Sequence, residues 1–280
     1  MGQALGRLLR ERGESIAGLA SRTPERASAA AAFVGGEAKA VSYTEIPQHA
    51  AHVLIAVPDD AIGDVAGALA RAGMHYGLAL HTSGARGPEA LAALAAAGVA
   101  CGTLHPLQTA ANPEEGVRVL PGVAFAIDGA PEAAAWAGRL VALLGGVALH
   151  IPAASRPLYH AAAVMAGNYV IALMSTAVML MREAGVEEAT ARRALQPLAR
   201  ASLENTFRLG PAVALTGPIA RGDADTVREH LLALAKVPAD VTRLYRAAGL
   251  AALEIARQRG LADAQAGAIE RLLRKGERCD

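Results

Sequence analysis

The pattern of apolar positions changes about halfway along the chain. In the first half, short apolar runs alternate with amphipathic segments of about 10–15 residues. The runs predicted as strands are residues 15–20, 52–57, 77–81, 99–104, 123–127 and 147–151. The segments predicted as helices are residues 2–12, 24–34, 60–72, 88–97 and 131–144. Strands that alternate with helices of this length indicate βαβ units and a mainly parallel sheet.

The second half has only helical periodicity. Its predicted helices are residues 155–184, 187–207, 223–235, 238–259 and 262–275, with turns at Gly185, Gly210-Pro211 and Gly217-Pro218. The change of pattern falls near Pro152. We therefore expect an α/β domain over residues 1–152 and an all-helical domain over residues 153–280.

The longest apolar stretch, residues 161–181, is long enough to cross a membrane. It contains Asn168, Tyr169, Ser175 and Thr176, and polar residues of this kind are rare in lipid. We therefore expect a buried core helix and no membrane partner. The stretch is apolar almost all round, and five helices can bury it only partly, which predicts a homodimer through the helical domain.

Charge and cysteine content narrow the class of protein. The chain has 280 residues, with 27 Lys and Arg against 26 Asp and Glu, and no basic stripe, so we expect no nucleic-acid partner. Cys101 and Cys279 lie far apart and are predicted to be free thiols in a reducing cytoplasm. Charged residues interrupt any signal peptide at the N-terminus. The eight histidines have no metal-ligand spacing, so we expect no metal site.

The first residues, MGQALGRLL, are typical of the end of a dinucleotide fingerprint that runs into a helix. Gly2 would be the third glycine of that fingerprint, and Met1 and Gly2 are predicted to contact the cofactor. The strand and the two earlier glycines are not in this sequence, and in a Rossmann sheet that strand lies in the middle. A sheet with a gap between the strands at 15–20 and 52–57 should not be stable. We expect either that the gene product starts about ten residues earlier or that the strands close up and the pyrophosphate turn is lost, and we expect little or no NADPH binding by the chain as given. An earlier start is the explanation that we favour.

The loop after the strand at 15–20 indicates the choice of cofactor. Ser21, Arg22 and Thr23 follow that strand, where a NAD-binding site usually has an acidic residue. An arginine beside hydroxyl groups suits the 2′-phosphate of NADP. Alternatively, Arg22 is a solvated residue and Thr23 caps the next helix. The position of these residues after the strand favours the phosphate interpretation.

Three further loops follow strands at the same edge of the predicted sheet. The backbone of Val57, Pro58 and Asp59 is predicted to form the wall on the nicotinamide side, although the neighbouring Asp60 can also serve as a helix cap. The other two loops contribute polar groups to a rim. In them, Ser83 and Gly84 are predicted to contact the cofactor, and His81, His105 and Gln108 to contact a small-molecule substrate. Structural histidines are the alternative.

Seven stretches carry a resemblance to a known family: MGQALGRLL, SRTPE, VLIAVPDDAI, LHTSG, GTLHPLQ, PLYHAAAVMAGNY and LTGPIARGD. The chain resembles the reductases of the 6-phosphogluconate-dehydrogenase-like superfamily, and more narrowly the bacterial proteins that join a Rossmann-like domain to a DUF2520 domain. The resemblance implies an N-terminal NADP-binding domain and a helical domain that often mediates dimers. It implies no particular substrate.

The helical half contributes the predicted catalytic residues. His160 and Asn168 are eight residues apart, about two turns, and so would share a helix face. β-Hydroxyacid dehydrogenases have a lysine and an asparagine on a comparable helix, but this helix has no lysine. His160 can donate a proton in its place, or it is a buried structural histidine. Arg221 can clamp a substrate carboxylate or cap a helix. The sequence thus predicts an NADP-dependent oxidoreductase that reduces a carbonyl or imine, with a non-catalytic dinucleotide sensor or assembly protein as the alternative.

Overall fold

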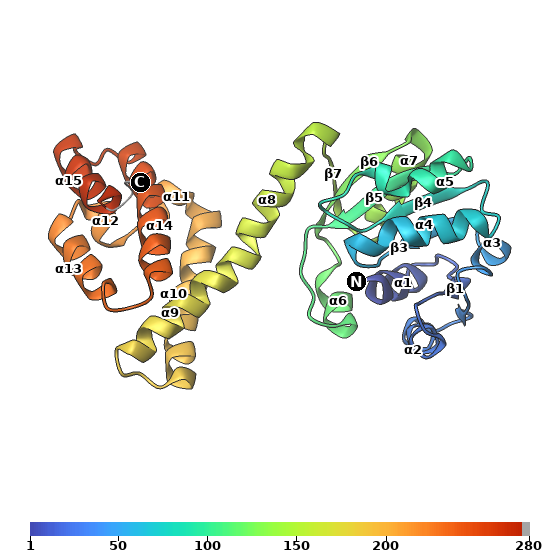
Figure 1. The fold of residues 1–280 in the computed structure, drawn as a ribbon, viewed down its shortest axis with the longest axis horizontal. Helices are drawn as coiled ribbons and strands as arrows, with labels where there is room; N and C mark the ends of the chain where they lie inside the picture. The colour runs from blue at the N-terminus through green and yellow to red at the C-terminus, as the bar shows by residue number, and fades with distance from the viewer. Residues whose placement is uncertain (276–280) are drawn as a thin grey trace. The chain divides into compact units, whose positions relative to one another are not determined.

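The computed structural model describes residues 1–275. The chain divides into two compact units, Met1–Val170 and Ile171–Asp280 (Figure 1). The first unit is α/β and the second is helical, which confirms the predicted fold class. The division falls later than the predicted boundary near Pro152, which instead lies between the last strand and the helix that follows it.

The main sheet of the first unit has five strands in chain order. These are β3 (His52–Ile55), β4 (Leu78–His81), β5 (Ala100–Pro106), β6 (Ala124–Gly129) and β7 (Val147–His150). Neighbouring strands are parallel except β5 and β6, which are antiparallel. The register aligns Ile55, His81, Thr103 and Asp128 across the sheet. Residues paired in this way point to the same face, so three polar side chains lie in one row.

Helices cover both faces of this sheet, and their apolar spacing explains why. In α1 (Gly2–Glu11), Leu5, Leu8 and Leu9 share one helix face and pack with Leu80 and Phe125 of the sheet. The same core takes in α7 (Pro131–Leu143). Burying each large apolar side chain of this kind contributes about 1.5–3 kcal/mol.

On the opposite face, α4 (Ile62–Arg71), α5 (Ala92–Ala96) and the short helix η2 (Pro88–Leu91) form a second core, and the short helix η1 (Asp59–Ala61) contacts α4. Cys101 belongs to this core as a free thiol, and burial raises its pKa to about 11. Cys279 lies outside the described residues. The remaining elements of the unit are α2 (Pro24–Val34), α3 (Ile46–His49), α6 (Pro113–Val119), η3 (Ala153–Ser155) and α8 (Arg156–Ala166).

A second, separate sheet consists of only two parallel strands, β1 (Gly18–Leu19) and β2 (Lys39–Ala40). Among the described residues, no hydrogen bonds join β1 to β3, which lies at the edge of the main sheet. The alternative in which the strands at 15–20 and 52–57 close up is therefore wrong for this structure.

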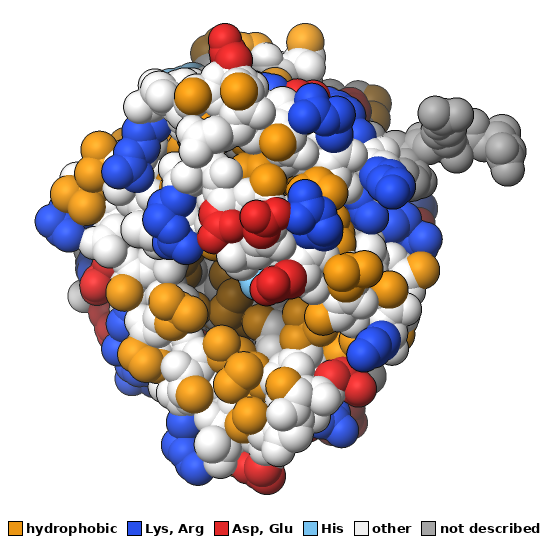
Figure 2. Space-filling model, turned by 90° about the vertical axis from the view of Figure 1, so that its left-hand side faces the viewer, with side chains coloured by type: hydrophobic (Ala, Val, Ile, Leu, Met, Phe, Trp, Pro, Cys, Tyr) orange, Lys and Arg blue, Asp and Glu red, His pale blue; other side chains and the backbone are white. Residues whose placement is uncertain are grey.

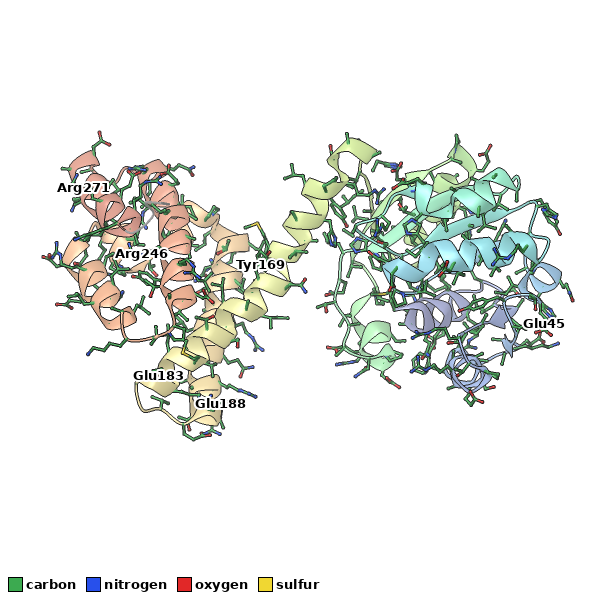
Figure 3. All side chains as sticks on the ribbon, viewed as in Figure 1. Glu45, Tyr169, Glu183, Glu188, Arg246 and Arg271 are labelled. Carbon is green, nitrogen blue, oxygen red and sulfur yellow. The ribbon has the colours of Figure 1, made fainter. Side chains whose placement is uncertain are left out.

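The second unit contains α10 (Glu188–Leu209), α11 (Pro211–Ala214), α12 (Gly217–Arg221), α13 (Ala224–Leu234), α14 (Ala239–Gln258) and α15 (Asp263–Arg274). Its core includes Val227, Leu253 and Ile269 from the last three of these helices. Arg246 of α14 donates hydrogen bonds to the carbonyl groups of Leu272 (2.6 Å) and Leu273 (2.8 Å), near the end of α15 (Figure 3). A cation there satisfies carbonyl groups that have no partner within the helix.

The prediction of a buried helix over residues 161–181 is wrong for the single chain. The structure divides this stretch at Gly167 between α8 and α9 (Asn168–Glu183), and α9 has no buried residue. Ile171 is 67% exposed. The segment Ala153–Glu183 is long and apolar enough to cross a membrane by length and composition. The physical reason for its exposure is that α13, α14 and α15 form the core of the second unit among themselves.

Candidate functional site

A cavity of about 1140 Å³ in the first unit is lined by predicted cofactor-binding residues. It is lined at the amino end of α1 by Met1 and Gly2, and after β1 by Ser21 and Arg22. Val57 and Pro58, which follow β3, also line the cavity. The cavity thus joins loops that follow two strands to the amino end of a helix, an arrangement that suits a dinucleotide.

Gly2 allows α1 to approach β3 closely. A Cβ atom at residue 2 would lie 2.8 Å from the Cβ atom of Ala56, a distance that would force one of them to shift. The amino end of α1 has no side-chain cap, so the first-turn N–H groups are available to an anion. Both observations fit the third glycine of a dinucleotide fingerprint.

The loop after β1 fits the phosphate of an adenosine 2′-phosphate. Arg22 is exposed, and both Arg22 and Arg26 line the cavity beside Ser21. The Thr23 hydroxyl accepts a hydrogen bond from the Arg26 N–H (3.4 Å), so Thr23 caps α2. Two cations and the Ser21 hydroxyl remain for a ligand, a donor set that fits NADP better than NAD.

His81 is buried, and its loop uses both of its ring nitrogens. The Nε2 atom lies 2.9 Å from the Gly87 carbonyl oxygen, and the Nδ1 atom accepts a hydrogen bond from the Ser83 N–H (3.2 Å). The Ser83 hydroxyl in turn accepts from the N–H groups of Ala85 (3.2 Å) and Arg86 (3.0 Å). This leaves His81 no ring nitrogen for the predicted contact with substrate, and the structure favours a structural role for it.

His105, Tyr159 and His160 form a cluster at the end of β5. The Tyr159 hydroxyl lies 2.7 Å from the His105 Nδ1 atom, and the two rings meet edge to face. The ring centroids of His105 and His160 are 6.4 Å apart. Gly84 leaves room for this cluster, because a Cβ atom at residue 84 would lie 2.7 Å from the His105 ring. The sequence had suggested that Gly84 contacts a cofactor. In the structure, its missing side chain leaves the space that the His105 ring occupies.

Burial and nearby positive charge hold His105 neutral. Desolvation, followed by the charges of His160 and Arg156, lowers the pKa of His105 to about 4. A neutral His105 can accept the hydrogen bond of the Tyr159 hydroxyl. Burial raises the pKa of Tyr159, so its hydroxyl keeps its proton at neutral pH. The negative charge of Asp59, the first residue of η1, favours protonated His105 and so offsets a part of this lowering of the pKa.

Arg156 anchors the first turn of α8 to the sheet. Its side chain is only 4% exposed, and one terminal nitrogen donates to a carboxylate oxygen of Asp128 at 2.9 Å. The other Asp128 oxygen accepts from the Gly129 N–H at 2.8 Å. Asp128 lies in the same row of the sheet as Thr103 and His81. The ion pair therefore fixes the turn that carries Tyr159 and His160 over the polar part of the sheet.

Two family models match the chain. Residues 1–73 match the family of coenzyme F420-dependent NADP oxidoreductases, and residues 123–252 match DUF2520, a domain of unknown function. The chain belongs to the Rossmann-type proteins that join these two domains. A search of curated proteins finds no significant match.

Solved structures share the fold. A protein of Thermotoga maritima has 24% identity and a TM-score of 0.74, over 91% of this chain and 96% of its own. A proposed NADP oxidoreductase of Bacteroides fragilis has 23% identity and a TM-score of 0.70, over 90% and 93%. Pyrroline carboxylate reductase of Plasmodium falciparum, solved with NADP bound, has 13% identity and a TM-score of 0.60, over 96% and 94%.

The remaining predicted site residues are Asn168, Gln108 and Arg221. Asn168 of the DUF2520 domain opens α9 and is exposed, and the described structure has no hydrogen bond between it and His160. The Gln108 side chain accepts a hydrogen bond from the Thr109 N–H (2.8 Å). Arg221 is the last residue of α12 in the second unit. Because α8 ends at Ala166, His160 and Asn168 belong to two helices and not to the single predicted helix.

The sequence analysis missed Arg156 and assigned no role to Tyr159. One signal was present for Arg156: a cation in the first turn of a helix opposes the helix dipole, so another interaction must hold it there. The pairing of Tyr159 with His105 joins residues 54 positions apart, and only the fold brings them together. Within residues 1–275, no group of three or more potential metal ligands is present.

Proposed function

We propose that the protein is an NADP-dependent oxidoreductase that reduces a small carbonyl or imine compound in the cytoplasm. The observation that carries this proposal is the cluster of His105, Tyr159 and His160 at the carboxyl end of β5 in a sheet of the NADP oxidoreductase type. Ligands of open α/β sheets bind at these strand ends. The similarity to pyrroline carboxylate reductase supports a substrate with a C=N bond.

The cofactor would be held by the cavity-lining residues. Arg22 and Arg26 suit the 2′-phosphate, the amino end of α1 suits the pyrophosphate, and the backbone of Val57, Pro58 and Asp59 forms the wall toward the nicotinamide. NADP, when bound in its reduced form, supplies the hydride. The chain's own residues must therefore bind the substrate and provide the proton.

His160 is the proposed proton donor. Its Nδ1 atom is buried and has no hydrogen-bond partner among the described residues, whereas both nitrogens of His81 are engaged. An imidazole with a free nitrogen can protonate the oxygen or nitrogen that gains charge during reduction. The hydrogen bond between Tyr159 and His105 holds in place the His105 ring, which lies beside the ring of His160. Arg156 is the positioning residue for both side chains of α8.

Arg22→Ala is expected to remove most of a preference for NADPH over NADH. Loss of a charge-assisted contact to the 2′-phosphate costs on the order of 1.5–3 kcal/mol, which is about 10- to 150-fold in affinity. Fluorescence titration of the two reduced cofactors measures the ratio. The pair 2′,5′-ADP and 5′-AMP measures it again at the adenosine end alone, without the pyrophosphate.

Arg12→Ala is the matched control for the cofactor experiment. Arg12 is an exposed arginine just after α1 and does not line the cavity, so its removal should leave the ratio unchanged. Equal affinities for NADPH and NADH in the unmutated protein would contradict the assignment of Arg22 to the 2′-phosphate.

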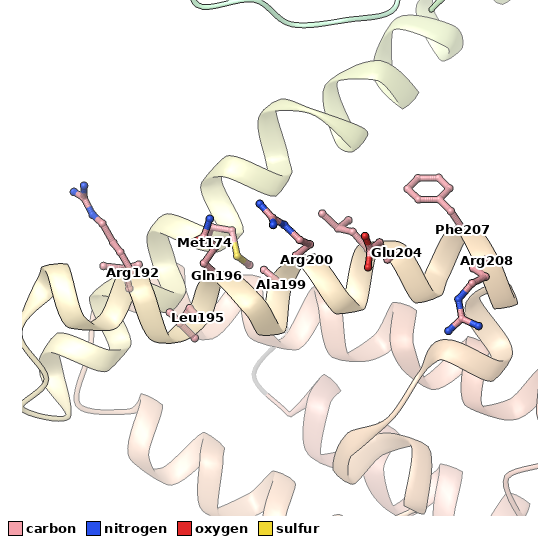
Figure 4. A pocket seen from close by; sticks show the side chains of 11 residues that line it. Met174, Arg192, Leu195, Gln196, Ala199, Arg200, Glu204, Phe207 and Arg208 are labelled. Atoms are coloured by element: carbon pink, nitrogen blue, oxygen red, sulfur yellow. The ribbon is translucent and has the colours of Figure 1, made fainter. Parts of the chain in front are cut away.

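We also propose a homodimer through the second unit. A cavity of about 820 Å³ between α9 and α10 is lined by Met174 and Val178 from α9 and by Leu195, Leu203 and Phe207 from α10 (Figure 4). Phe207 is 86% exposed and points away from its helix. Figure 2 shows the side of the molecule at the left of Figure 1, where apolar side chains are interspersed with basic and acidic ones. A second copy brings an identical apolar face with the same charges, as a two-fold interface requires.

Phe207→Glu is expected to convert the dimer to a monomer, because it would bury a charge in an apolar interface. Light scattering at micromolar concentration measures the mass. Leu232→Glu, at a position that is 67% exposed on α13 and outside the cavity, is the control and should leave the dimer intact. A monomeric mass for the unmutated protein would overturn the dimer proposal.

A further inference from the structure

A group of buried side-chain atoms near the carboxyl end of β5 has no hydrogen-bond partner within residues 1–275. These are the Oγ1 atom of Thr103, the Nε and Nη1 atoms of Arg156 and the Nδ1 atom of His160. Thr103 is fully buried, and Arg156 is only 3% exposed. Buried polar side chains in folded proteins nearly always have a partner. The proposed reduction uses His160 and leaves the hydroxyl and the guanidinium without a role.

The fold brings these atoms together around Asp128. Thr103 pairs with Asp128 across β5 and β6, so their side chains share a face of the sheet. Arg156 donates to the same carboxylate through its Nη2 atom at 2.9 Å. His105 is two residues beyond Thr103 on β5 and therefore points to the same face. Arg156 and His160 are four residues apart on α8 and share one face of that helix. The unpartnered hydroxyl and guanidinium thus lie in the cluster that contains the proposed proton donor.

The chemistry of these groups calls for a negatively charged ligand. A guanidinium has only N–H donors, so its ligand must supply acceptors. Asp128 is 27% exposed and also accepts from a backbone N–H, so it neutralises Arg156 only in part. The positive charges of His160 and Arg156 contribute to the lowered pKa of His105, which indicates a positive potential at the cluster. The opposing carboxylate, Asp59, is exposed and therefore screened by solvent.

We propose that Arg156 and Thr103 form a carboxylate site for the substrate, so that the reductase acts on short oxo acids or imino acids. This inference rests on the proposed function and names the class of its substrate. Residues four apart on a helix have Cβ atoms about 5–6 Å apart. A small molecule with its carboxylate at Arg156 therefore places the adjoining carbon atoms within reach of His160. The reducible bond is expected roughly one or two carbon atoms from the carboxylate.

Arg156 is buried but close to the surface of the first unit. Its neighbours Ser155 and Pro157 are exposed, and Arg156 belongs to neither hydrophobic core of the unit. A shift of the first turn of α8 is therefore sufficient to bring the two free nitrogen atoms to a ligand. The carboxylate then provides the charge-assisted hydrogen bonds that these nitrogen atoms lack.

The test is the binding of pyruvate and of pyruvamide to the full chain in the absence of NADPH, followed by the NMR signal of the Arg156 Nε–H group. The two compounds share the oxo group, and pyruvamide has a neutral amide in place of the carboxylate. Pyruvate should shift the signal with roughly tenfold or higher affinity than pyruvamide, because hydrogen bonds to charged groups are the stronger ones. Arg156→Lys keeps a positive charge beside Asp128 and identifies the signal by its loss.

Thr103→Val separates binding from folding. Valine has the shape of threonine without the hydroxyl, and loss of a buried hydroxyl that has no partner among the described residues should not lower the urea midpoint of unfolding. Affinity for pyruvate should fall by about fivefold or more. Thr176→Val is the matched control. Thr176 of α9 lies in the second unit, where its hydroxyl donates to the Ala172 carbonyl at 3.0 Å, so its loss should leave the affinity unchanged.

Three results would overturn the carboxylate site: equal affinity for the two compounds, no shift of the Arg156 signal by pyruvate, or unchanged affinity in Thr103→Val. None of these measurements involves NADPH or turnover. If the carboxylate site fails, the reductase is still tested by oxidation of NADPH with neutral carbonyl compounds. If the reductase fails, pyruvate should still bind to Arg156 and Thr103. The two failures are therefore distinguishable.

Discussion

His160→Ala is expected to lower turnover by about 10²–10⁴-fold, the range for loss of a general acid. The substitution removes the one ring of the cluster with a buried nitrogen that lacks a partner among the described residues. Affinity for NADPH should barely change, because His160 does not line the cofactor cavity. Steady-state rates with a reducible substrate, together with cofactor titrations, measure both effects.

The second unit provides a matched control for this substitution. His230 lies 2.9 Å from the Tyr245 hydroxyl, and their rings meet edge to face, as those of His105 and Tyr159 do. His230→Ala therefore removes a histidine beside a tyrosine without touching the proposed site, and turnover should stay the same. If the turnover of His160→Ala is unaltered, His160 is not the proton donor and has a structural role.

Asp128→Ala is expected to destabilise the protein by about 3–5 kcal/mol, because it leaves the buried charge of Arg156 without its partner. Arg156→Met should cost less than Asp128→Ala. It leaves a carboxylate that is 27% exposed to solvent and still accepts the Gly129 N–H. Urea unfolding of the two variants and of the double variant measures the order and the coupling between the residues.

An exposed ion pair provides the reference change in unfolding free energy for this comparison. Arg7 and Glu11 are a pair four residues apart on α1, 42% and 39% exposed, and Glu11→Ala should cost about 1 kcal/mol or less. If Asp128→Ala costs no more than Glu11→Ala, the ion pair with Arg156 does not anchor α8 to the sheet.

The sequence was sufficient to predict long helices with a clear apolar periodicity and strands that are apolar throughout. The strands at residues 52–57, 77–81 and 99–104 have close counterparts in the structure, because strands of a parallel sheet covered by helices are recognised directly from apolar runs. The strand β2 was missed, since Lys39 and Ala40 are both exposed and too few to form a pattern. The pairing of β1 with β2 and not with β3 was not predicted, because fold topology, rather than local pattern, dictates which strands are neighbours.

The site was less predictable than the sheet. Strand ends indicated the positions of His81 and His105 correctly, but only the hydrogen bonds of the loop from Ser83 to Gly87 show that His81 is fully engaged. The role of Arg156 depends on Asp128, which lies 28 residues earlier in the chain. The exposure of α9 was missed because its apolar composition is the same for a core helix and for a helix that awaits a partner chain.

Substrate-dependent oxidation of NADPH tests the proposed reductase most directly. The full chain is mixed with NADPH or NADH and a panel of small carbonyl and cyclic imine compounds, and loss of the reduced nicotinamide is followed by absorbance. We expect at least one compound to cause oxidation, faster with NADPH than with NADH, and His160→Ala to suppress it. Binding of NADPH without oxidation by any compound in the panel would contradict the reductase and favour a dinucleotide sensor.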